Sequence, residues 1–466
     1  MTSVVVIGGG VSGLAAALKL VARGCAVKVL EAAGEPGGAT RTTRREGFLL
    51  EAGPDSFITI KPWGLDLIRR LGLGGEIVGT NPSLRRSFVI KRSRLLPIPE
   101  GFYLLGPTRI LPFVISPLLS WPGKWRALAD LWLPRGPAVE DESLASFVTR
   151  RFGREMLDRI AQPMVAGIYT ADPRTLSLRA TFPAFLEMEK KYGSVIRGLR
   201  ARRGRGEEAA ASGPRYGLFA TLRGGLGGLV DALVKGLPAS TLACGVRAER
   251  LERSGAGWRV TARGGATFDA EGVVLALPAP GAGELLRPLD RGLGDLLDGV
   301  PYATAITVNL GYRREQIRHP LDGFGFVTPD VERREVLACT FSSVKFPERA
   351  PEGRVLLRAF MGGAARPDHA RWEAAELAKA AVEDLAVLLG ITGEPLFADV
   401  VRHVNSMPQY LVGHVERAAR IRARVRGLPG LALAGTACDG IGLPDTIHAG
   451  ESAAHELLGA LVAKTN

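Results

Sequence analysis

A glycine-rich turn near the N-terminus limits the choice of fold more than any other feature. It reads Gly-Gly-Gly-Val-Ser-Gly at 8–13, which is G-x-G-x-x-G. An apolar strand pattern precedes it at 4–7, and an apolar helix pattern follows at 14–22. A second strand pattern at 26–30 ends in Glu31, 18 positions after the last glycine of the turn. This strand-helix-strand context predicts a dinucleotide-binding unit.

Each part of the turn has a physical role. Gly8 permits the tight turn, Gly10 lets the backbone approach a pyrophosphate, and Gly13 lets helix and strand pack closely. The helix N-terminus offers free N–H groups to the phosphates, and Glu31 can accept hydrogen bonds from a ribose. The alternative is a glycine-rich turn that binds nothing. The predicted cofactor contacts of this unit are Gly8, Gly10, Val11, Ser12, Gly13 and Glu31.

The segment after Glu31 favours FAD over a nicotinamide cofactor. A glycine pair at 37–38 and Arg41 follow the acid, and Gly-Pro-Asp-Ser stands at 53–56. This order resembles the FAD-binding half of the flavin amine oxidase superfamily, whereas a nicotinamide dehydrogenase does not need the glycine pair there. The cofactor contacts predicted from this segment are Gly37, Gly38, Arg41, Gly53, Pro54, Asp55 and Ser56.

The C-terminal end of the chain agrees with this interpretation. A strand pattern at 430–434 enters a glycine turn, and a helix pattern runs over 446–463 with Asp445 as its expected N-cap. In the superfamily the corresponding helix N-terminus points at the flavin ring, where its dipole stabilises negative charge. The alternative is an ordinary strand-turn-helix that closes a sheet. The contacts predicted here are Gly435, Ile441, Gly442 and Leu443.

Composition and charge narrow the function classes. The chain has 466 residues, enough for two or three domains, and a net charge of +13. No RNP, zinc-finger or helix-turn-helix pattern supports nucleic-acid binding. An anionic substrate, an anionic membrane surface or a generally basic surface all fit the charge.

The four cysteines are widely scattered and form no C-x-x-C pair. This pattern argues against a metal site and against a disulfide framework, and it fits a reducing cytoplasm. The first residues, Met1-Thr2-Ser3, carry no basic region typical of a signal peptide. We therefore expect a cytoplasmic protein.

The segment 101–133 is more apolar than a surface loop needs to be. Its apolar core at 110–121 is too short for a membrane span and contains two prolines. Basic residues at 109, 124 and 126 and tryptophans at 121, 125 and 132 suit contact with a membrane interface. A buried helical hairpin or the wall of a substrate cavity is the alternative.

These patterns predict a mixed α/β protein with a discontinuous Rossmann-like FAD-binding domain. We assign 1–60, 214–300 and 406–466 to that domain. We assign 61–84 and 301–405 to a mixed-sheet substrate-binding domain, and 85–213 to a helical, membrane-contacting domain. A polar low-complexity stretch at 200–213 is expected to be a loop. Helix patterns cover 64–71, 143–152, 154–165, 181–190 and 373–389.

Over its whole length the chain resembles the porphyrinogen oxidases, the family of protoporphyrinogen oxidase and coproporphyrinogen III oxidase. The resemblance rests on six segments, 51–56, 166–177, 181–183, 323–326, 407–414 and 440–445. It implies non-covalent FAD, no metal and a six-electron oxidation of a cyclic tetrapyrrole in haem biosynthesis. Three hydride transfers to the flavin would be followed by reoxidation with O2 and release of H2O2. Protoporphyrinogen IX is the first expected substrate and coproporphyrinogen III the alternative.

The resemblance also carries over individual residues. Gly167 is expected to lie against the substrate, Phe324 to pack on a pyrrole ring, and Val246 to contact the adenine side of FAD. His403 stands where the family often has Trp near the flavin. Lys61 is a candidate partner for a substrate carboxylate.

Besides His403, the chain departs from the family pattern at a position expected to bind a carboxylate of the substrate. Near Ser87 the protoporphyrinogen-specific members often have an arginine for a propionate, and the neighbouring Arg86 is our candidate for that role. The basic residues around it would suit the four propionates of coproporphyrinogen, or they form a solvated or membrane-facing surface. No convincing general base is visible, because His319, His369, His414 and His448 are isolated. The site therefore has no assigned catalytic side chain.

Three rival functions stay open. An amine oxidase would want an aromatic residue in the C-terminal turn, where this chain has Gly442-Leu443-Pro444. A carotenoid desaturase usually shows a different C-terminal glycine motif, and a non-enzymatic FAD-binding protein is the rival from another class. If the protein is a porphyrinogen oxidase, we expect three partners. They are a porphyrinogen, the inner face of the cell membrane through peripheral contact, and a second copy of the chain in a homodimer.

Overall fold

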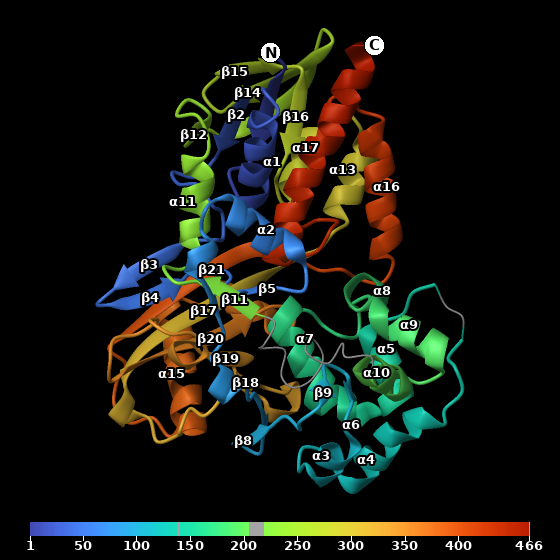
Figure 1. The fold of residues 1–466 in the computed structure, drawn as a ribbon, viewed down its shortest axis with the longest axis vertical. Helices are drawn as coiled ribbons and strands as arrows, with labels where there is room; N and C mark the ends of the chain where they lie inside the picture. The colour runs from blue at the N-terminus through green and yellow to red at the C-terminus, as the bar shows by residue number, and fades with distance from the viewer. Residues whose placement is uncertain (138–139, 205–218, 466) are drawn as a thin grey trace.

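The computed structural model describes residues 1–137, 140–204 and 219–465 (Figure 1). Both termini lie at one end of the elongated molecule, next to the helix that closes the chain. The expected loop at 200–213 begins inside a helix, α10 (Val195–Gly204), and the rest of that segment lies outside the described residues.

A five-stranded parallel sheet occupies the end that carries the termini. Its order is β12-β2-β1-β16-β22, so β1 pairs with β2 on one side and with β16 on the other. The sheet joins strands from three distant stretches of the chain, as the strand patterns predicted. The strands are β1 (Ser3–Ile7), β2 (Ala26–Glu31), β12 (Leu242–Cys244), β16 (Gly272–Leu275) and β22 (Leu431–Leu433).

Two helices from opposite ends of the chain lie side by side on this sheet. They are α1 (Val11–Val21) and α17 (Leu443–Thr465), and both bury apolar residues in one core with α11 (Gly227–Lys235). The helices approach closely because a Cβ on Gly450 would lie 2.1 Å from the carbonyl oxygen of Ser12. This packing brings the N-termini of both helices toward the middle of the molecule (Figure 1).

The other face of the parallel sheet is covered by a small antiparallel sheet and two helices. Trp258 is 1% exposed in the core that they share. The elements are β13 (Ala248–Ser254), β14 (Gly257–Ala262), β15 (Thr267–Ala270), α12 (Ala279–Leu286) and α13 (Arg291–Asp298), with α16 (His414–Arg426) beside α13.

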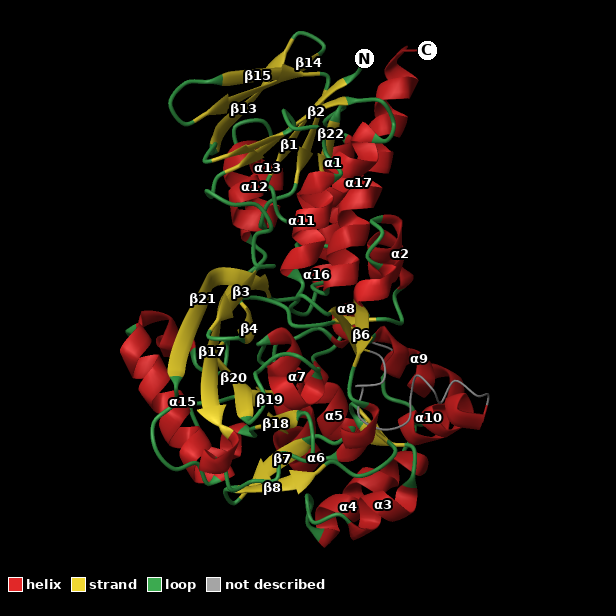
Figure 2. Cartoon of the chain, turned by 60° about the vertical axis from the view of Figure 1, so that its left-hand side comes forward, coloured by secondary structure: helices red, strands yellow, loops and turns green. Residues whose placement is uncertain are grey.

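A seven-stranded sheet lies below, in the order β21-β17-β20-β19-β18-β7-β8 (Figure 2). One face packs on α15 (Ala374–Leu389) through alternating residues such as Ile306, Val308 and Leu310. The opposite face therefore carries the residues between them. The strands are β7 (Phe88–Lys91), β8 (Arg94–Pro97), β17 (Tyr302–Arg313), β18 (Gly325–Val327), β19 (Ala338–Phe341), β20 (Arg354–Gly362) and β21 (Phe397–Pro408).

Most of the region 110–204 is helical and has its own apolar core. The predicted helix at 154–165 is one helical stretch with a π-helical turn at Leu157–Ala161 in its middle. The predicted helix at 181–190 starts at Pro183, since proline suits a first turn. The helices are α3 (Ile110–Ile115), α4 (Trp121–Leu128), α5 (Leu144–Phe152), α6 (Arg154–Met156), α7 (Gln162–Tyr169), α8 (Leu178–Thr181), α9 (Pro183–Tyr192) and α10.

Short elements connect these layers. One small sheet has the order β5-β11-β6, and two hairpins pair β3 with β4 and β9 with β10. Their bounds are β3 (Thr42–Arg45), β4 (Phe48–Glu51), β5 (Phe57–Ile58), β6 (Ile77–Gly79), β9 (Phe102–Tyr103), β10 (Gly106–Pro107) and β11 (Phe219–Leu222).

Two segments pack differently from the predicted division into domains. Residues 88–97, assigned to the helical part, form the hairpin β7–β8 of the seven-stranded sheet. The pattern was missed because Arg92 and Ser93 take the left-handed turn positions, where Asn-Gly is the usual signal. Helix α2 (Pro62–Arg70), assigned to the substrate domain, packs on α17. The three-domain division itself stays a prediction.

Among the described residues no helix is both long and apolar enough to cross a membrane. The described part of the chain also contains no cluster of His, Cys, Asp and Glu side chains that could hold a metal ion.

Candidate functional site

The turn at 8–13 has the geometry of a dinucleotide cradle. Gly8 has a φ of +108°, and a Cβ on Gly13 would lie 1.9 Å from the carbonyl oxygen of Gly8. Gly10 differs from both, because a Cβ there would meet nothing within 4 Å. Two of the glycines are therefore required by the protein's own backbone, and the third faces open space.

A pyrophosphate fits that space. Gly10 is the N-cap of α1 and supplies no side-chain cap, so the first N–H groups of the helix are free to bind an anion. The Ser12 hydroxyl is buried in the same turn and has no hydrogen-bond partner among the described residues. A phosphate oxygen would satisfy this hydroxyl and the N–H groups together.

The acid after β2 and the second glycine pair complete the cradle. The two carboxylate oxygens of Glu31 accept hydrogen bonds from the backbone N–H groups of Gly9 and Ala33, both at 2.7 Å. The N–H of Gly37 donates to the carbonyl of Gly9 at 2.8 Å, which holds the second glycine pair against the first turn. Val246 donates its N–H to the Glu31 carbonyl at 2.8 Å and so lies on the ribose side.

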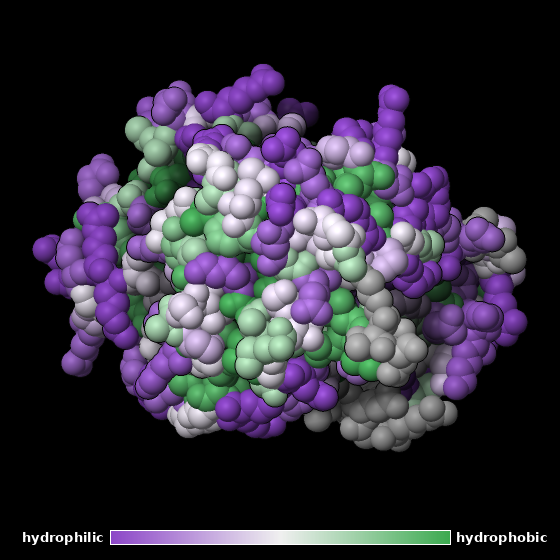
Figure 3. Space-filling view, turned by 90° about the horizontal axis from the view of Figure 1, so that it is seen from above, coloured by the Kyte–Doolittle hydropathy of each residue, from purple (hydrophilic) through white to green (hydrophobic). Residues whose placement is uncertain are grey.

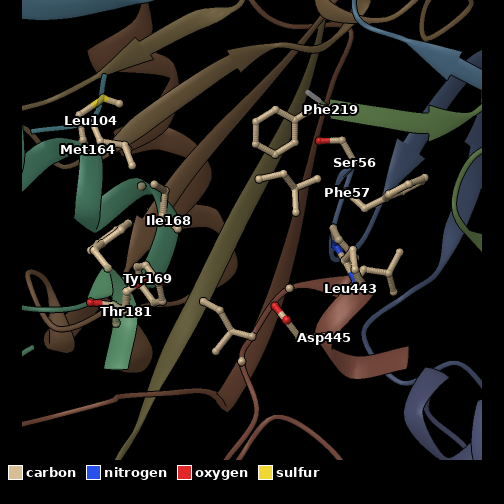
Figure 4. Close-up of a pocket in the computed structure, with 18 of the residues that line it drawn as sticks. Ser56, Phe57, Leu104, Met164, Ile168, Tyr169, Thr181, Phe219, Leu443 and Asp445 are labelled. Atoms are coloured by element: carbon tan, nitrogen blue, oxygen red, sulfur yellow. Dashed lines mark hydrogen bonds between the residues drawn. The ribbon is translucent and has the colours of Figure 1, made fainter. Parts of the chain in front are cut away.

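A cavity of about 850 Å³ lies between the helical region and the segments 53–58 and 438–445. Figure 4 shows its two walls. Ser56, Phe57, Leu443 and Asp445 stand on one side, and a mostly apolar group from the residue after β9 to the end of α8 faces them, namely Leu104, Met164, Ile168, Tyr169 and Thr181. The predicted site residues that line the cavity are Gly53, Pro54, Asp55, Ser56, Lys61, Gly167, Phe324, Ile441, Gly442 and Leu443.

Two of the residues expected to contact substrate, Gly167 on α7 and Phe324 just before β18, both line the cavity. Gly167 is exposed on α7, and a Cβ there would reach Val327 at an ordinary 3.6 Å. Phe324 is 1% exposed, and the glycines beside it pack against the protein's own backbone. A Cβ on Gly323 would lie 2.9 Å from the Arg86 carbonyl oxygen, and one on Gly325 would lie 2.0 Å from that of Cys339. These glycines therefore serve strand packing, and they give no evidence of a ligand.

Helix α17 begins at Leu443, so the expectation that Asp445 caps it is wrong. Pro444 fits into the first turn of the helix. Backbone N–H groups there have no acceptor within the helix, so the absence of an N–H in proline costs no hydrogen bond. Asp445 lies in that turn, and its carboxylate accepts a hydrogen bond from Lys61 Nζ at 2.5 Å. Lys61 is itself the N-cap residue of α2, so the pair ties two helix N-termini together beside the cavity.

Tyr410 and His414 support the glycine turn that leads into α17. The Tyr410 hydroxyl donates to the Thr436 carbonyl at 2.6 Å and accepts from the Gly440 N–H at 2.9 Å. The His414 ring stacks on Tyr410 with 4.0 Å between ring centroids, and both residues line the cavity. Burial, aided by nearby arginines, lowers the pKa of His414 to about 4, so this imidazole is neutral at pH 7.

Sequence reasoning missed a buried charged group in the cavity wall. Lys345 Nζ lies 3.1 Å from both carboxylate oxygens of Asp55, and Arg358 extends from β20 to the carbonyls of Ala52 and Gly53. Burial opposes ionisation of Asp55, but Lys345 and Arg358 outweigh it and lower the pKa of Asp55 to about 2. Neither Lys345 nor Arg358 belongs to a sequence motif that would have indicated its place in the site.

Some predicted residues lie outside the cavity lining. The expectation that Arg86 reaches a substrate carboxylate is not supported, because its side chain is 66% exposed and pairs with Asp322 at 3.1 Å. His403 bonds through Nε2 to the Ala52 carbonyl at 2.9 Å, behind the segment that lines the cavity. Arg41 is exposed near the cradle, and Gly435 takes a φ of +105° in the turn after β22.

Comparisons with known proteins agree with this geometry. The family model "Flavin containing amine oxidoreductase" matches residues 11–458. The chain is 34% identical to the coproporphyrinogen III oxidase of Bacillus subtilis (strain 168), covering 98% of this chain and 97% of that protein. It is 36% identical to that of Propionibacterium freudenreichii subsp. freudenreichii, covering 99% and 92%.

A solved structure is similar over its whole length. The crystal structure of an Exiguobacterium sp. 255-15 protein, assigned as a protoporphyrinogen oxidase, matches with a TM-score of 0.87 and 30% identity. The match covers 98% of each chain.

The fold and the cradle thus define a flavin-dependent oxidoreductase. The chain belongs to the family of flavin-containing amine oxidoreductases, and it is an oxidase.

Proposed function

We propose that this protein is an FAD- and O2-dependent porphyrinogen oxidase of haem synthesis. One observation carries the proposal: a single cavity joins the cofactor-side segment 53–56 and the α17 N-terminus to a broad apolar wall. A broad, apolar macrocycle needs such a wall. Relatives that match this chain over nearly its whole length bear the names of enzymes that oxidise porphyrinogens. Bound FAD would supply the hydride acceptor, and O2 would reoxidise it with release of H2O2.

The protein's own contribution is positioning and electrostatics. The apolar side chains of Leu104 after β9 and of Met164, Ile168 and Tyr169 on α7 exclude water and hold the macrocycle against the opposite wall. The α17 N-terminus, held by Lys61 and Tyr410, directs its dipole into the cavity, where it stabilises negative charge. His414 is neutral at pH 7 and can accept or donate one hydrogen bond.

For the substrate, the cavity favours coproporphyrinogen III over the protoporphyrinogen IX that we placed first from sequence. Five cationic and three acidic side chains line it. Coproporphyrinogen III carries four propionates, so an excess of positive charge suits it better. The cationic residues are Lys61, Arg179, Lys345, Arg358 and Arg422.

Anaerobic mixing with each porphyrinogen tests both parts of the proposal. The yellow holoenzyme should be bleached by coproporphyrinogen III faster than by protoporphyrinogen IX, and air should restore the colour. Bleaching by neither compound would contradict porphyrinogen oxidation. Faster bleaching by protoporphyrinogen IX would contradict the substrate choice alone.

We also propose peripheral membrane contact through α3 and α4. Large apolar side chains on these helices and in the turn after α4 are 61–72% exposed, and the segment 102–104 between the helices and β8 lines the cavity. These groups are Leu111, Ile115, Trp121, Trp125 and Trp132. The helices lie at the end of the molecule opposite the termini, whereas hydrophilic residues ring much of the face near the termini (Figure 3). The predicted flanking Lys124 is in fact 6% exposed, with its Nζ over Trp121.

A further inference from the structure

Three cations and two acids are buried together beside the cavity. Lys345, Arg349 and Arg358 are 7%, 3% and 2% exposed, and Glu51 is 4% exposed. Asp55 completes the group, with its side chain 18% exposed. The group therefore holds more positive than negative charge in a place where an unbalanced charge is costly.

The unused hydrogen-bonding capacity of this group lies at Arg358. One terminal nitrogen donates to the Ala52 and Gly53 carbonyls, but the buried Nε has no partner among the described residues. In the strand register Arg358 pairs with Asn309 on β17, and the buried amide nitrogen of Asn309 also lacks a partner there. Unpaired buried donors are rare in native proteins and indicate that something accepts from them.

Lys345 and Arg358 reach the cavity, and Arg349 does not. The Lys345 ammonium lies 3.0 Å from the Ser56 hydroxyl, and both cations line the cavity. The Arg349 guanidinium is occupied by the Arg223 and Leu222 carbonyls and the Thr221 hydroxyl. The positive charge available to a ligand is thus that of Lys345 and Arg358.

The strand register also shows which face of the seven-stranded sheet carries Arg358. Arg358 on β20 pairs with Thr340 on β19, and Thr340 pairs with Gly325 on β18, next to Phe324. Cross-strand partners point to the same face of a sheet. Arg358 therefore stands with Thr340 and Gly325 on the face of the sheet opposite α15, and it borders the cofactor-side segment 53–56 through Gly53.

We propose that Lys345 and Arg358 form a buried subsite for an organic anion, and that this anion is a propionate carboxylate of the substrate. This inference rests on the proposed function and adds to it the residues that recognise the acid. A bidentate guanidinium and an ammonium together match a carboxylate. Negative charge on the reduced cofactor is the other source of the same chemistry, because segment 53–56 also borders the subsite.

The test measures binding of coproporphyrin III and of its uncharged tetramethyl ester to the holoenzyme by fluorescence. In Lys345→Gln and Arg358→Gln the free acid should bind about tenfold to a hundredfold more weakly, the effect of one lost charged hydrogen bond. Binding of the ester should not change. Lys124→Gln is the matched control, since Lys124 is equally buried but lies outside the cavity lining.

The midpoint potential of the flavin is measured in the same variants. A lower potential with unchanged porphyrin binding would assign the subsite to the cofactor and overturn the carboxylate assignment. No change in either quantity would overturn the subsite. If Arg358→Gln does not fold, Lys345→Gln decides, and Arg358→Lys should retain most of the binding. A wild-type protein that neither oxidises porphyrinogens nor binds porphyrin would instead contradict the proposed function.

Discussion

Lys61 Nζ and Asp445 Oδ1 lie 2.5 Å apart, although 384 positions separate the two residues in sequence. Asp445 is nearly buried, with 9% of its side chain exposed, whereas 43% of the Lys61 side chain is exposed. A Cβ on Gly440 would lie 2.7 Å from the Asp445 carboxyl carbon, so the carboxylate also packs on the glycine turn. The pair therefore fixes the turn that carries the α17 N-terminus.

Asp445→Asn should weaken both stability and cofactor retention. The loss of one partly exposed ion pair at a helix N-terminus is expected to cost about 1 kcal/mol of unfolding free energy. The turn beside it should loosen, so flavin should dissociate faster. Urea unfolding and flavin fluorescence during dialysis measure the two effects. Asp66→Asn, which removes an exposed contact to Arg69 on α2, is the control and should change neither.

Gly10 and Gly13 should fail in different ways when they are replaced. Gly13→Ala places a Cβ 1.9 Å from the Gly8 carbonyl oxygen, which should destabilise the fold by about 3 kcal/mol. A Cβ at position 10 would meet nothing within 4 Å, and the backbone there is extended, so the Gly10→Val apoprotein should keep its stability. Its side chain would fill the pyrophosphate space, and flavin should be lost.

The measurements are the thermal midpoint of the apoprotein and the flavin content after purification. Gly34→Ala, at an exposed position with open space, is the control for both. A Gly10→Val protein that purifies with full flavin would contradict the assignment of this turn to the pyrophosphate.

Residues that are close together in sequence could be predicted as parts of the site, whereas residues that only the fold brings together could not. The cradle was predictable because its parts lie within 31 consecutive residues, and the spacing of its glycines is a recognised motif. Lys345 and Arg358 could not be found that way. Arg358 reaches the cavity through the pairing of β20 with β19 and β17, and Lys345 contacts Asp55, which lies 290 positions away in sequence. The Phe324 prediction came from the family resemblance, and the glycines on both sides of Phe324 are explained by their contacts with the Arg86 and Cys339 carbonyls.

Gly167 should separate stability from activity. Glycine inside a helix is less stable than alanine, so Gly167→Ala should raise stability by up to about 1 kcal/mol, with its methyl group in ordinary contact with Val327. Gly167→Leu should keep the helix but narrow the cavity, and displacement of the macrocycle should lower kcat/KM about a hundredfold. Urea unfolding and steady-state kinetics measure the two. Equal activity of Gly167→Leu and wild type would show that the substrate does not approach α7.

His414 should make stability depend on pH between about 4 and 6.5. Its pKa is lowered to about 4 in the folded protein from an ordinary 6.5, so the unfolded chain binds more protons within this window. Stability therefore rises with pH across the window, by about 3 kcal/mol in all, and is lost as the pH falls. His414→Phe keeps the ring on Tyr410 and should remove this dependence. Urea unfolding at pH 4.5, 5.5, 6.5 and 8 measures it, with the exposed His455→Phe as control.

The exposed tryptophans of α4 and of the turn after it provide the test of membrane contact. Trp121, Trp125 and Trp132 are 61%, 67% and 72% exposed, so their replacement by serine removes apolar surface without emptying a core. Each indole buried in a lipid interface contributes enough that the triple variant should bind anionic vesicles at least about tenfold more weakly. Vesicle co-sedimentation measures the binding, and Val387→Ser, at an exposed apolar position on α15, should leave it unchanged. Equal binding by the triple variant and the wild-type protein would place any membrane contact elsewhere on the surface, because these side chains are the largest exposed apolar groups of the described chain.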